Sequence, residues 1–428
     1  MIEKLIKFSW GYAVFKAYVN FIHKYVHYRK IEIIGEENLP KDGPMIFVSN
    51  HQNALMDPLA VVLTAPGQPV SLARADIFKK PLFRKLLNTL KILPIYRQRD
   101  KVNTKEKNEE IFELLSQVLS AGKSMVIMPE GNNAAVRKLR PLKKGFARIA
   151  FKAESENNFD LNIKVIPMGL EYSSYTKTRS KLYIKYGKPL SVSEYENIWE
   201  ESPDKATTKL TSDLSDRLKS VIINLPNQEV HRVSSLEVDL KYAPNKLNLA
   251  QREAAFEEAV ERYSSVLEKN EDDQLQQKVK EIENSFKKLG EIPQHWNMFN
   301  TKIGFGDILL TVLSLPIAVW GYLHHSPLVL VHNWLNTKVK DKEFTSTFKL
   351  AAAVFVLPIV YLIFLGVSFI IPDSTLQLAY LISIPLSGII TFSLEEKYLH
   401  LLLRIKSIWM SKNPNWKKIK ELEDHLFN

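Results

Sequence analysis

Two long uncharged apolar segments near the C-terminus constrain this chain more than any other feature. Residues 350–371 contain no charged side chain, and residues 376–394 repeat the pattern after the short turn Pro372-Asp373-Ser374. At about 1.5 Å per residue, a helix of either length reaches across the roughly 30 Å hydrocarbon core of a bilayer. The pattern predicts a transmembrane hairpin over residues 350–394. A pair of fully buried core helices is the alternative interpretation.

Basic residues flank the predicted hairpin on both sides, whereas its turn carries none. Four lysines precede it and three cations follow it: Lys338, Lys340, Lys342, Lys349, Lys397, Arg404 and Lys406. Cations near membrane segments are retained on the cytoplasmic side. We therefore expect a membrane protein whose hairpin ends, and whose large preceding domain, lie on the cytoplasmic face.

A shorter apolar stretch lies upstream within the predicted membrane region, residues 301–428. Residues 308–323 reach only roughly 24 Å as a helix, and apolar character resumes after His324-His325-Ser326-Pro327. A re-entrant or interfacial segment over 308–334 is therefore expected. The paired histidines have no third ligand nearby in the sequence and do not predict a metal site.

The first 30 residues alternate aromatic side chains with lysines at positions 4, 7, 16 and 24. No small-residue cleavage site follows, so a secretory signal peptide is not expected. This composition suits an amphipathic helix lying at the membrane interface. A helix packed on the protein's own core fits equally well, and both interpretations stay open.

Composition narrows the classes of partner. The chain has 428 residues, 45% of them hydrophobic, which is enough for two or three domains, and a formal net charge of +11. Because the basic residues flank apolar segments instead of forming one Lys/Arg run, an anionic bilayer and phosphorylated substrates are favoured over nucleic acid. The absence of cysteine excludes disulfides, thiolate metal ligands and cysteine nucleophiles.

Strand and helix patterns alternate over residues 31–225. Strands are expected at 31–34, 45–48, 70–73, 92–95, 125–128, 163–168 and 182–186, and helices at 58–65, 81–90, 104–121 and 144–154. This alternation predicts an α/β layered domain with a mainly parallel sheet. From about Pro203 the chain becomes charge-dense, and helical periodicity at 249–269 and 272–289 predicts a solvated helical insert over 226–300.

His51 is the lone histidine between residues 30 and 230, and it follows the apolar run 45–48 directly. A histidine at the end of a core strand with a carboxylate nearby, here Asp57, is typical of a general base. The pair Asp57-Pro58 is also an ordinary helix start with aspartate as the N-cap. Residues six apart are about 240° apart around a helix, so His51 and Asp57 meet only if residues 52–56 fold back as a loop.

Two further strands are expected to end in charged residues. The strand 92–95 is followed by Arg97 and Arg99, and the strand 125–128 by Glu130 and Gly131. Guanidinium groups at the carboxyl edge of a sheet suit a phosphate ligand. More cations follow in the loop before the next helix: Arg137, Lys138, Arg140, Lys143 and Lys144.

In this order the motifs resemble those of the glycerolipid acyltransferases, the glycerol-3-phosphate and 1-acylglycerol-3-phosphate O-acyltransferases. The resemblance covers roughly residues 30–225 and includes Asn50-His51 with Asp57, Pro94-Ile95 with Arg97, Pro129-Glu130-Gly131, and Val165-Ile166-Pro167. The long membrane-spanning C-terminus is similar to that of the extended glycerol-3-phosphate acyltransferases. The resemblance implies a layered acyltransferase domain followed by the helical insert and the membrane helices.

The resemblance also implies roles for residues. His51 would deprotonate the acceptor hydroxyl, and Asp57 would hold the imidazole, while the hydroxyl attacks the thioester of acyl-CoA or acyl-carrier protein. No metal or resident cofactor is implied. The residues expected to bind the substrates are Asn50, Arg97, Arg99, Glu130, Gly131, Arg137, Arg140, Lys143 and Lys144.

This sequence departs from the family's pattern in two features, one spacing and one residue pair. Five residues separate His51 from Asp57 where the family has four, and Asn132-Asn133 stand where the family has threonine and arginine. Arg137, Arg140 or Lys144 is expected to replace that arginine.

The resemblance implies acylation of glycerol 3-phosphate, with 1-acylglycerol 3-phosphate as the alternative acceptor. A non-catalytic lipid-binding or tethering protein is the second alternative. Metal-dependent hydrolysis is excluded because the predicted domain lacks a second histidine.

Overall fold

The computed structural model describes residues 1–427, apart from 98–99, 101, 244, 268–271 and 340. The chain divides into two compact units, each built from separate stretches. The first, here called the sheet unit, comprises Met1–Lys177, Leu182–Asn224 and Asp341–Thr347. The second, the helical unit, comprises Thr178–Lys181, Leu225–Lys340 and Phe348–Asn428. Each unit is described by itself.

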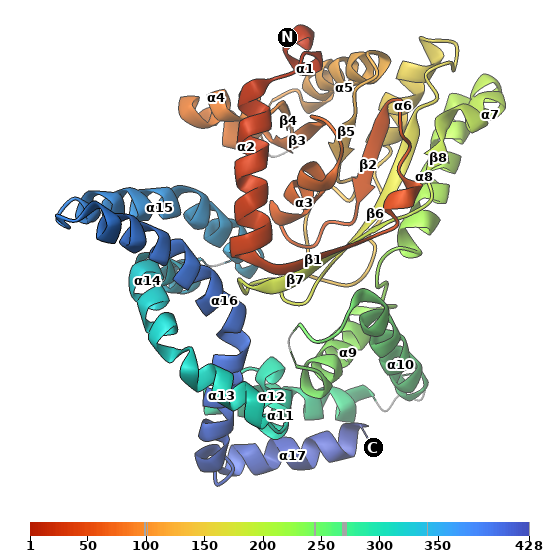
Figure 1. The fold of residues 1–428 in the computed structure, drawn as a ribbon. Helices are drawn as coiled ribbons and strands as arrows, with labels where there is room; N and C mark the ends of the chain where they lie inside the picture. Colours follow the sequence, from red (N-terminus) through yellow and green to blue (C-terminus); the bar gives the residue numbers. More distant parts are fainter. Residues whose placement is uncertain (98–99, 101, 244, 268–271, 340, 428) are drawn as a thin grey trace. The chain divides into compact units, whose positions relative to one another are not determined.

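The sheet unit contains an eight-stranded sheet in the order β1-β7-β6-β2-β5-β3-β4, with β8 paired to β6 (Figure 1). The strands are β1 Tyr28–Ile34, β2 Met45–Ser49, β3 Val70–Arg74, β4 Ile92–Ile95, β5 Met125–Ile127, β6 Lys164–Tyr172, β7 Ser180–Tyr186 and β8 Leu190–Ser191. Pairings among β2, β3, β4, β5 and β6 are parallel, whereas β7 and β8 pair antiparallel with β6. The prediction of a mainly parallel sheet is confirmed, and only the two-residue β8 was not foreseen.

Strand β2 lies in the middle of this sheet and all five of its residues are buried. Ile46 and Val48 point to a core shared with helices α5, α6 and α8, whose bounds are Thr104–Ser120, Gly145–Ser155 and Pro203–Lys219. Figure 1 shows α2 and α3 (Trp10–Phe21 and Met56–Thr64) on the viewer's side of the sheet. Burial on both faces explains the unbroken apolar run of β2, since a strand in a parallel sheet has no solvated side.

The charge-dense stretch that begins at Pro203 is solvated on one face only. Helix α8 places Leu210, Leu214 and Leu218 in the core at 0% exposure. These residues recur every four positions and so form one apolar stripe, while the charged residues occupy the opposite face. The many charged residues of the segment made this apolar stripe hard to recognise in the sequence.

The N-terminal segment folds onto the sheet unit. It forms α1 (Ile2–Ile6), α2 and a π-helix (Ile22–His27) that leads into β1. Tyr12 and Val19 of α2 are buried, whereas Trp10 and Phe21 are among its most exposed side chains. One face therefore packs on the protein's own core and the other stays open. Contact of the open face with lipid stays a prediction.

The remaining helices of the sheet unit are short connections. In the described part they are the 3-10 turns Glu36–Asn38, Ala75–Lys79, Val192–Tyr195 and Lys342–Phe344, with α4 (Pro81–Thr89) and α7 (Glu196–Glu201).

Apart from Thr178–Lys181, which includes the first two residues of β7, the described part of the helical unit consists of helices and turns. They are α9 (Gln228–Lys241), α10 (Leu249–Leu267), α11 (Asp272–Leu289), the turn Pro293–His295, α12 (Trp296–Asn300), α13 (Phe305–Leu313), α14 (Leu315–Lys338), α15 (Thr345–Ser368, which starts in the sheet unit), α16 (Ser374–Met410) and α17 (Pro414–Phe427). Trp296, Phe286 and Trp416 share one core, so the segment predicted as an insert packs together with the C-terminal helices.

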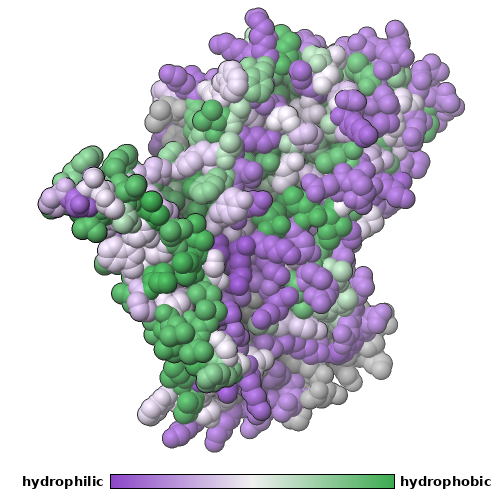
Figure 2. Space-filling view, viewed as in Figure 1, coloured by the Kyte–Doolittle hydropathy of each residue, from purple (hydrophilic) through white to green (hydrophobic). Residues whose placement is uncertain are grey.

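Among the described residues, two helices are long and apolar enough to cross a membrane, Lys342–Ser368 and Ser374–Met410. The pair α13 and α14 passes the same test only if the two are taken together, and they are bent by 54°. Figure 2 shows a broad hydrophobic surface where Figure 1 draws α13 to α16. Candidate membrane spans thus follow the acyltransferase-like region, as expected.

The break in the upstream apolar segment lies elsewhere than predicted. Helix α14 runs unbroken through His324-His325-Ser326-Pro327, and the bend falls at Ser314. Pro327 lacks the N–H that would pair with the carbonyl of Leu323. The Ser326 hydroxyl donates to that carbonyl at 2.8 Å, which satisfies it and lets the helix continue.

Candidate active site

The site begins where β2 ends. Both polar atoms of the Asn50 side chain pair with the backbone of Leu170 on β6, at 2.9 and 2.8 Å. The amide group thereby extends the β2–β6 pairing by one residue beyond the strand. Because Asn50 is also buried, its contacts suit a role in fixing the start of the following loop.

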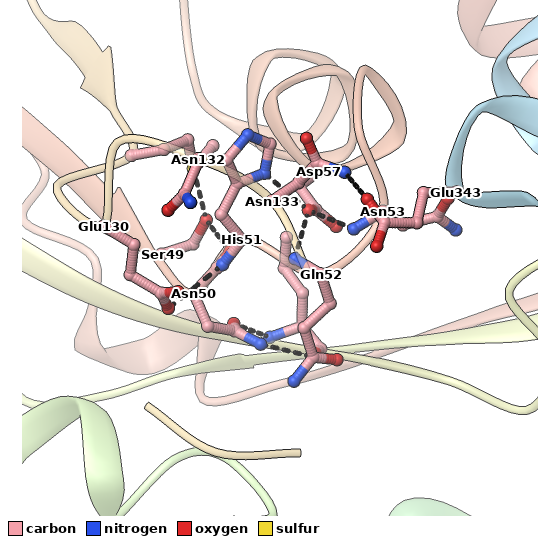
Figure 3. Close-up of polar contacts among 12 residues, drawn as sticks. Ser49, Asn50, His51, Gln52, Asn53, Asp57, Glu130, Asn132, Asn133 and Glu343 are labelled. Carbon is pink, nitrogen blue, oxygen red and sulfur yellow. Dashed lines mark hydrogen bonds and ion pairs between the residues drawn. The ribbon is translucent and has the colours of Figure 1, made fainter. Parts of the chain in front are cut away.

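His51 and Asp57 are brought together by the loop between them, as Figure 3 shows. His51 Nδ1 lies 2.8 Å from Asp57 Oδ2, and the backbone N–H groups of Gln52 and Asn53 each donate to the same oxygen at 2.6 Å. The fold-back that the spacing requires is thus produced by the loop's own amides. A carboxylate only accepts, so Nδ1 carries the proton and Nε2 is left as the acceptor.

Asp57 does not cap helix α3, contrary to one expectation from the sequence. The helix begins at Met56 with Leu55 as its N-cap, and Asp57 lies in the first turn. Its other oxygen, Oδ1, accepts the Tyr172 hydroxyl at 2.5 Å. Asp57 is completely buried, so these donors are what compensate its lost hydration.

Tyr172, at the end of β6, was not identified from the sequence. Burial and the neighbouring Asp57 charge hold the pKa of Tyr172 well above its usual value, so the hydroxyl keeps its proton. The available signal was positional. Carboxyl ends of parallel strands meet at one sheet edge, and β6 runs parallel to β2.

Glu130 and Arg140 hold the other side of the His51 backbone. Glu130 accepts from the His51 N–H at 3.3 Å and forms an ion pair with Arg140. Arg140 donates to the His51 carbonyl at 3.0 Å and to the Asn132 side chain at 2.7 Å. Arg140 therefore braces the loop after β5 against the loop after β2.

Burial raises the pKa of Glu130, and the Arg140 guanidinium opposes that rise. The opposition matters because a buried carboxylate without a cation would favour its protonated form. Without Arg140, the Glu130 carboxyl group beside the His51 backbone would therefore favour its protonated form.

Arg97 and Lys143 lie beside Gly131. Arg97 Nη2 approaches the Gly131 carbonyl at 3.5 Å, and a Cβ on Gly131 would lie 2.6 Å from Lys143 Nζ. Gly131 has a φ of +77°, which glycine adopts without strain. Two cations and this turn thus share one edge of the sheet. Arg99 lies outside the described residues.

The other predicted cations are placed away from this edge or are already paired. Arg137 forms a buried ion pair with Glu171 at 2.8 Å and stacks over the Tyr175 ring. Lys144 donates to Thr208 of α8 at 2.7 Å. The structure therefore does not bring Lys144 to His51, and Arg137 faces the end of β6.

Within the described part of the chain, no three His, Asp or Glu side chains gather as metal ligands would.

Part of the chain is similar to known proteins. Residues 30–171 match the acyltransferase family model. This part of the chain is therefore an acyltransferase domain, and it includes His51, Asp57 and Glu130 of the described site.

Two curated relatives have names that specify acceptors. The chain is 28% identical over 155 residues to glycerol-3-phosphate O-acyltransferase 2 of Saccharomyces cerevisiae, covering 36% of this chain and 20% of that protein. It is 27% identical over 160 residues to the 1-acyl-sn-glycerol-3-phosphate acyltransferase of Cocos nucifera, covering 36% of this chain and 47% of that protein. The chain thus spans a fifth of the length of the Saccharomyces cerevisiae protein and about half of the length of the Cocos nucifera protein.

A solved structure also matches. The 1-acyl-sn-glycerophosphate acyltransferase of Thermotoga maritima is 19% identical, with a TM-score of 0.37 and coverage of 49% of this chain and 78% of that one.

Proposed function

We propose that the protein transfers a fatty acyl group from a thioester donor, acyl-CoA or acyl-carrier protein, to glycerol 3-phosphate at a membrane. The 1-acylglycerol 3-phosphate reaction is the alternative. The match of residues 30–171 to the acyltransferase family and the names of the two relatives support this chemistry. The long apolar helices favour the extended glycerol-3-phosphate enzymes as the better comparison.

One observation carries the proposal, namely the state of the His51 ring. Nδ1 is held by buried Asp57, while Nε2 has no hydrogen-bond partner among the described residues. The side chain is 15% exposed, so a substrate hydroxyl can reach it. An oriented imidazole with one open acceptor nitrogen is the arrangement that a general base requires.

The proposed reaction needs no covalent enzyme intermediate. The acceptor hydroxyl gives its proton to His51 Nε2 as its oxygen attacks the thioester carbonyl carbon. The tetrahedral intermediate then expels the thiolate, which takes the proton back from the imidazolium, and an ester remains. Asp57 stabilises the transient positive charge on His51, because its carboxylate is buried beside Nδ1.

The acceptor phosphate is assigned to Arg97 and Lys143. Both side chains lie beside Gly131. Glu130 and Arg140 fix the loop that contains Gly131 to the His51 backbone. Arg97 offers a planar fork to phosphate oxygens. Arg140 and Arg137, already committed to carboxylates, act as supports in this proposal.

We further propose that the acyltransferase domain lies on the cytoplasmic face, with residues 350–394 as a transmembrane hairpin. Residues 1–30 then serve as the interfacial segment, through the aromatic face of α2 that stays open. The positive charge at both ends of the hairpin supports this orientation.

The test is direct. Purified full-length protein in lipid nanodiscs is incubated with radiolabelled acyl-CoA or acyl-carrier protein and either glycerol 3-phosphate or 1-acylglycerol 3-phosphate. Turnover of the first acceptor supports the proposal, and turnover of the second alone selects the alternative. Turnover of neither acceptor with either donor would overturn the enzymatic function and favour a lipid-binding protein.

A further inference from the structure

The segment Asp341–Thr347, here called the strap, belongs to the sheet unit although the rest of that unit ends at Asn224. It consists of the 3-10 turn Lys342–Phe344 and the first residues of α15. Its two ends continue into α14 and along α15, so the strap is part of the connection between two apolar helices. None of the motifs that resemble the acyltransferase family includes it.

One end of the strap supports the loop between His51 and Asp57. Ser346, 1% exposed, donates its hydroxyl to the Tyr175 carbonyl at 2.8 Å. Tyr175 in turn donates its own hydroxyl to the Gln52 side chain at 3.0 Å. Gln52 provides one of the N–H groups that hold Asp57. Ser346 is thus linked to the Asp57 carboxylate through two intervening residues.

The other end of the strap supports the loop after β5. Glu343 accepts a hydrogen bond from the Asn133 side chain, and Figure 3 shows the pair beside the His51–Asp57 loop. The next residue, Ala134, donates its N–H to the His51 carbonyl at 3.1 Å. Glu343 is therefore linked to the His51 backbone through Asn133 and Ala134, a route that shares no residue with the one from Ser346.

We propose that Glu343 and Ser346 are positioning residues for acyl transfer, each fixing one of the two loops that place His51 and Asp57. The inference rests on the proposed function of this site. Loops of this kind move unless their polar groups are held, and a misplacement of about 1 Å at a reacting group can cost ~10²-fold in rate. The strap thereby makes the geometry of the site depend on the connection into α15.

The chain offers matched variants for the test. Glu343→Ala removes the acceptor for Asn133, whereas Glu343→Gln keeps an acceptor oxygen and removes the charge. Asp341→Asn is the charge control, because Asp341 is exposed and its side chain makes no hydrogen bond or ion pair among the described residues. Ser346→Ala removes the hydroxyl that holds Tyr175.

Rates are measured with the full-length protein in nanodiscs, with acyl-CoA and the acceptor that wild type turns over. Glu343→Ala and Ser346→Ala should each lower kcat by about 10-fold with little change in KM for the acceptor, since positioning acts in the transition state. Glu343→Gln should restore most of kcat, and Asp341→Asn should match wild type. Equal losses in Glu343→Gln and Glu343→Ala would overturn positioning through this hydrogen bond.

Hydrogen exchange supplies a readout that needs no activity. The amides of residues 50–57 should exchange faster in Glu343→Ala and Ser346→Ala, while the midpoint of thermal unfolding stays near the wild-type value. Unchanged exchange together with unchanged kcat would overturn the inference. An inactive wild type whose exchange still responds to the variants would overturn the proposed function and leave the structural coupling standing.

Discussion

At the scale of single residues, the site is organised around the buried carboxylate of Asp57. Three donors besides the His51 ring reach it, two backbone N–H groups and the Tyr172 hydroxyl. A buried charge is tolerated only when it is well hydrogen-bonded, so these contacts fix the loop as well as the imidazole. The five-residue separation between His51 and Asp57 is thus accommodated without loss of the contact between them.

Tyr172→Phe tests this arrangement. Loss of a hydrogen bond to a charged group typically costs about 1.5–3 kcal/mol, so the unfolding midpoint in detergent should fall. The rate should also drop, because Asp57 is then held from one side only. Tyr12→Phe removes another buried tyrosine hydroxyl, one that donates to the Pro69 carbonyl instead of a carboxylate, and serves as the control. Equal stability and rate in Tyr172→Phe and wild type would contradict the prediction.

His51→Ala should reduce acyl transfer by ~10²–10⁴-fold, the usual contribution of a positioned base. Membrane association should be unchanged, because the apolar helices lie in another part of the chain. The measurements are the rate in nanodiscs and the fraction of protein that sediments with membranes after carbonate extraction. A variant that retains wild-type rate would remove His51 from the mechanism.

The sequence allowed the His51–Asp57 contact to be predicted but not the partners of the nearby cations. Arg137 and Arg140 are equally basic in the sequence, yet Arg137 pairs with Glu171 and Arg140 with Glu130. The choice depends on which strand ends meet at the sheet edge, and spacing along the chain does not contain that information. The contact of Lys144 with Thr208 of α8 was not predictable for the same reason, and substrate binding by Lys144 stays a prediction.

At the scale of elements, β6 depends on a close approach at Gly169. A Cβ there would lie 1.8 Å from the carbonyl oxygen of Val221, which is backbone and cannot turn aside. Strand β6 and the segment after α8, which contains Val221, would have to separate. Strand β6 carries both Leu170 and Tyr172 of the site.

Gly169→Ala should therefore destabilise the sheet unit by about 3 kcal/mol or more, at the upper end of the overpacking range. Thermal unfolding monitored by intrinsic fluorescence measures the effect. Gly306→Ala is the control, since no atom lies within 4 Å of the Cβ it would add. A Gly169→Ala protein as stable as that control would contradict the close approach.

The π-helix Ile22–His27 buries His23 completely, and neither of its ring nitrogens has a hydrogen-bond partner in the described part of the chain. Burial lowers the pKa of His23 from 6.5 to about 3. Between these two values the unfolded chain binds a proton that the folded protein does not bind. Stability contributed by neutral His23 is therefore present above pH 6.5 and is lost as the pH falls toward 3.

His23→Phe should flatten this acid limb, by up to about 1.4 kcal/mol per pH unit. The unfolding midpoint of both proteins is followed in detergent from pH 7 downward, and the difference between them is compared. Parallel curves would show that His23 does not contribute to the acid sensitivity.

Helices and strands were predicted well where the apolar residues follow a single period. They were predicted poorly where a side chain replaces a missing backbone hydrogen bond. The seven strands longer than two residues were recognisable as apolar runs. The continuity of α14 through Pro327 was not, because it depends on the Ser326 hydroxyl reaching the Leu323 carbonyl. Apolar character alone does not distinguish a satisfied proline from a helix end.

At the scale of the whole molecule, the absence of cysteine makes the orientation of the proposed hairpin easy to measure. Single cysteines are introduced as Pro372→Cys in the turn before α16 and Lys412→Cys beyond its end. With both hairpin ends in the cytoplasm, a membrane-impermeant maleimide should label the first in intact cells. It should label the second only after permeabilisation. Labelling of Lys412→Cys alone in intact cells would reverse the orientation.

The sheet unit is assembled from three separate stretches, and the last of these, Asp341–Thr347, follows α14 in the chain. A ribosome synthesises from the N-terminus, so residues 1–224 emerge well before the stretch that completes their unit. Helices α13 and α14 must leave the ribosome in between. The sheet unit can therefore be completed only after α13 and α14 have been synthesised. A nascent chain released before residue 347 would carry an unfinished domain.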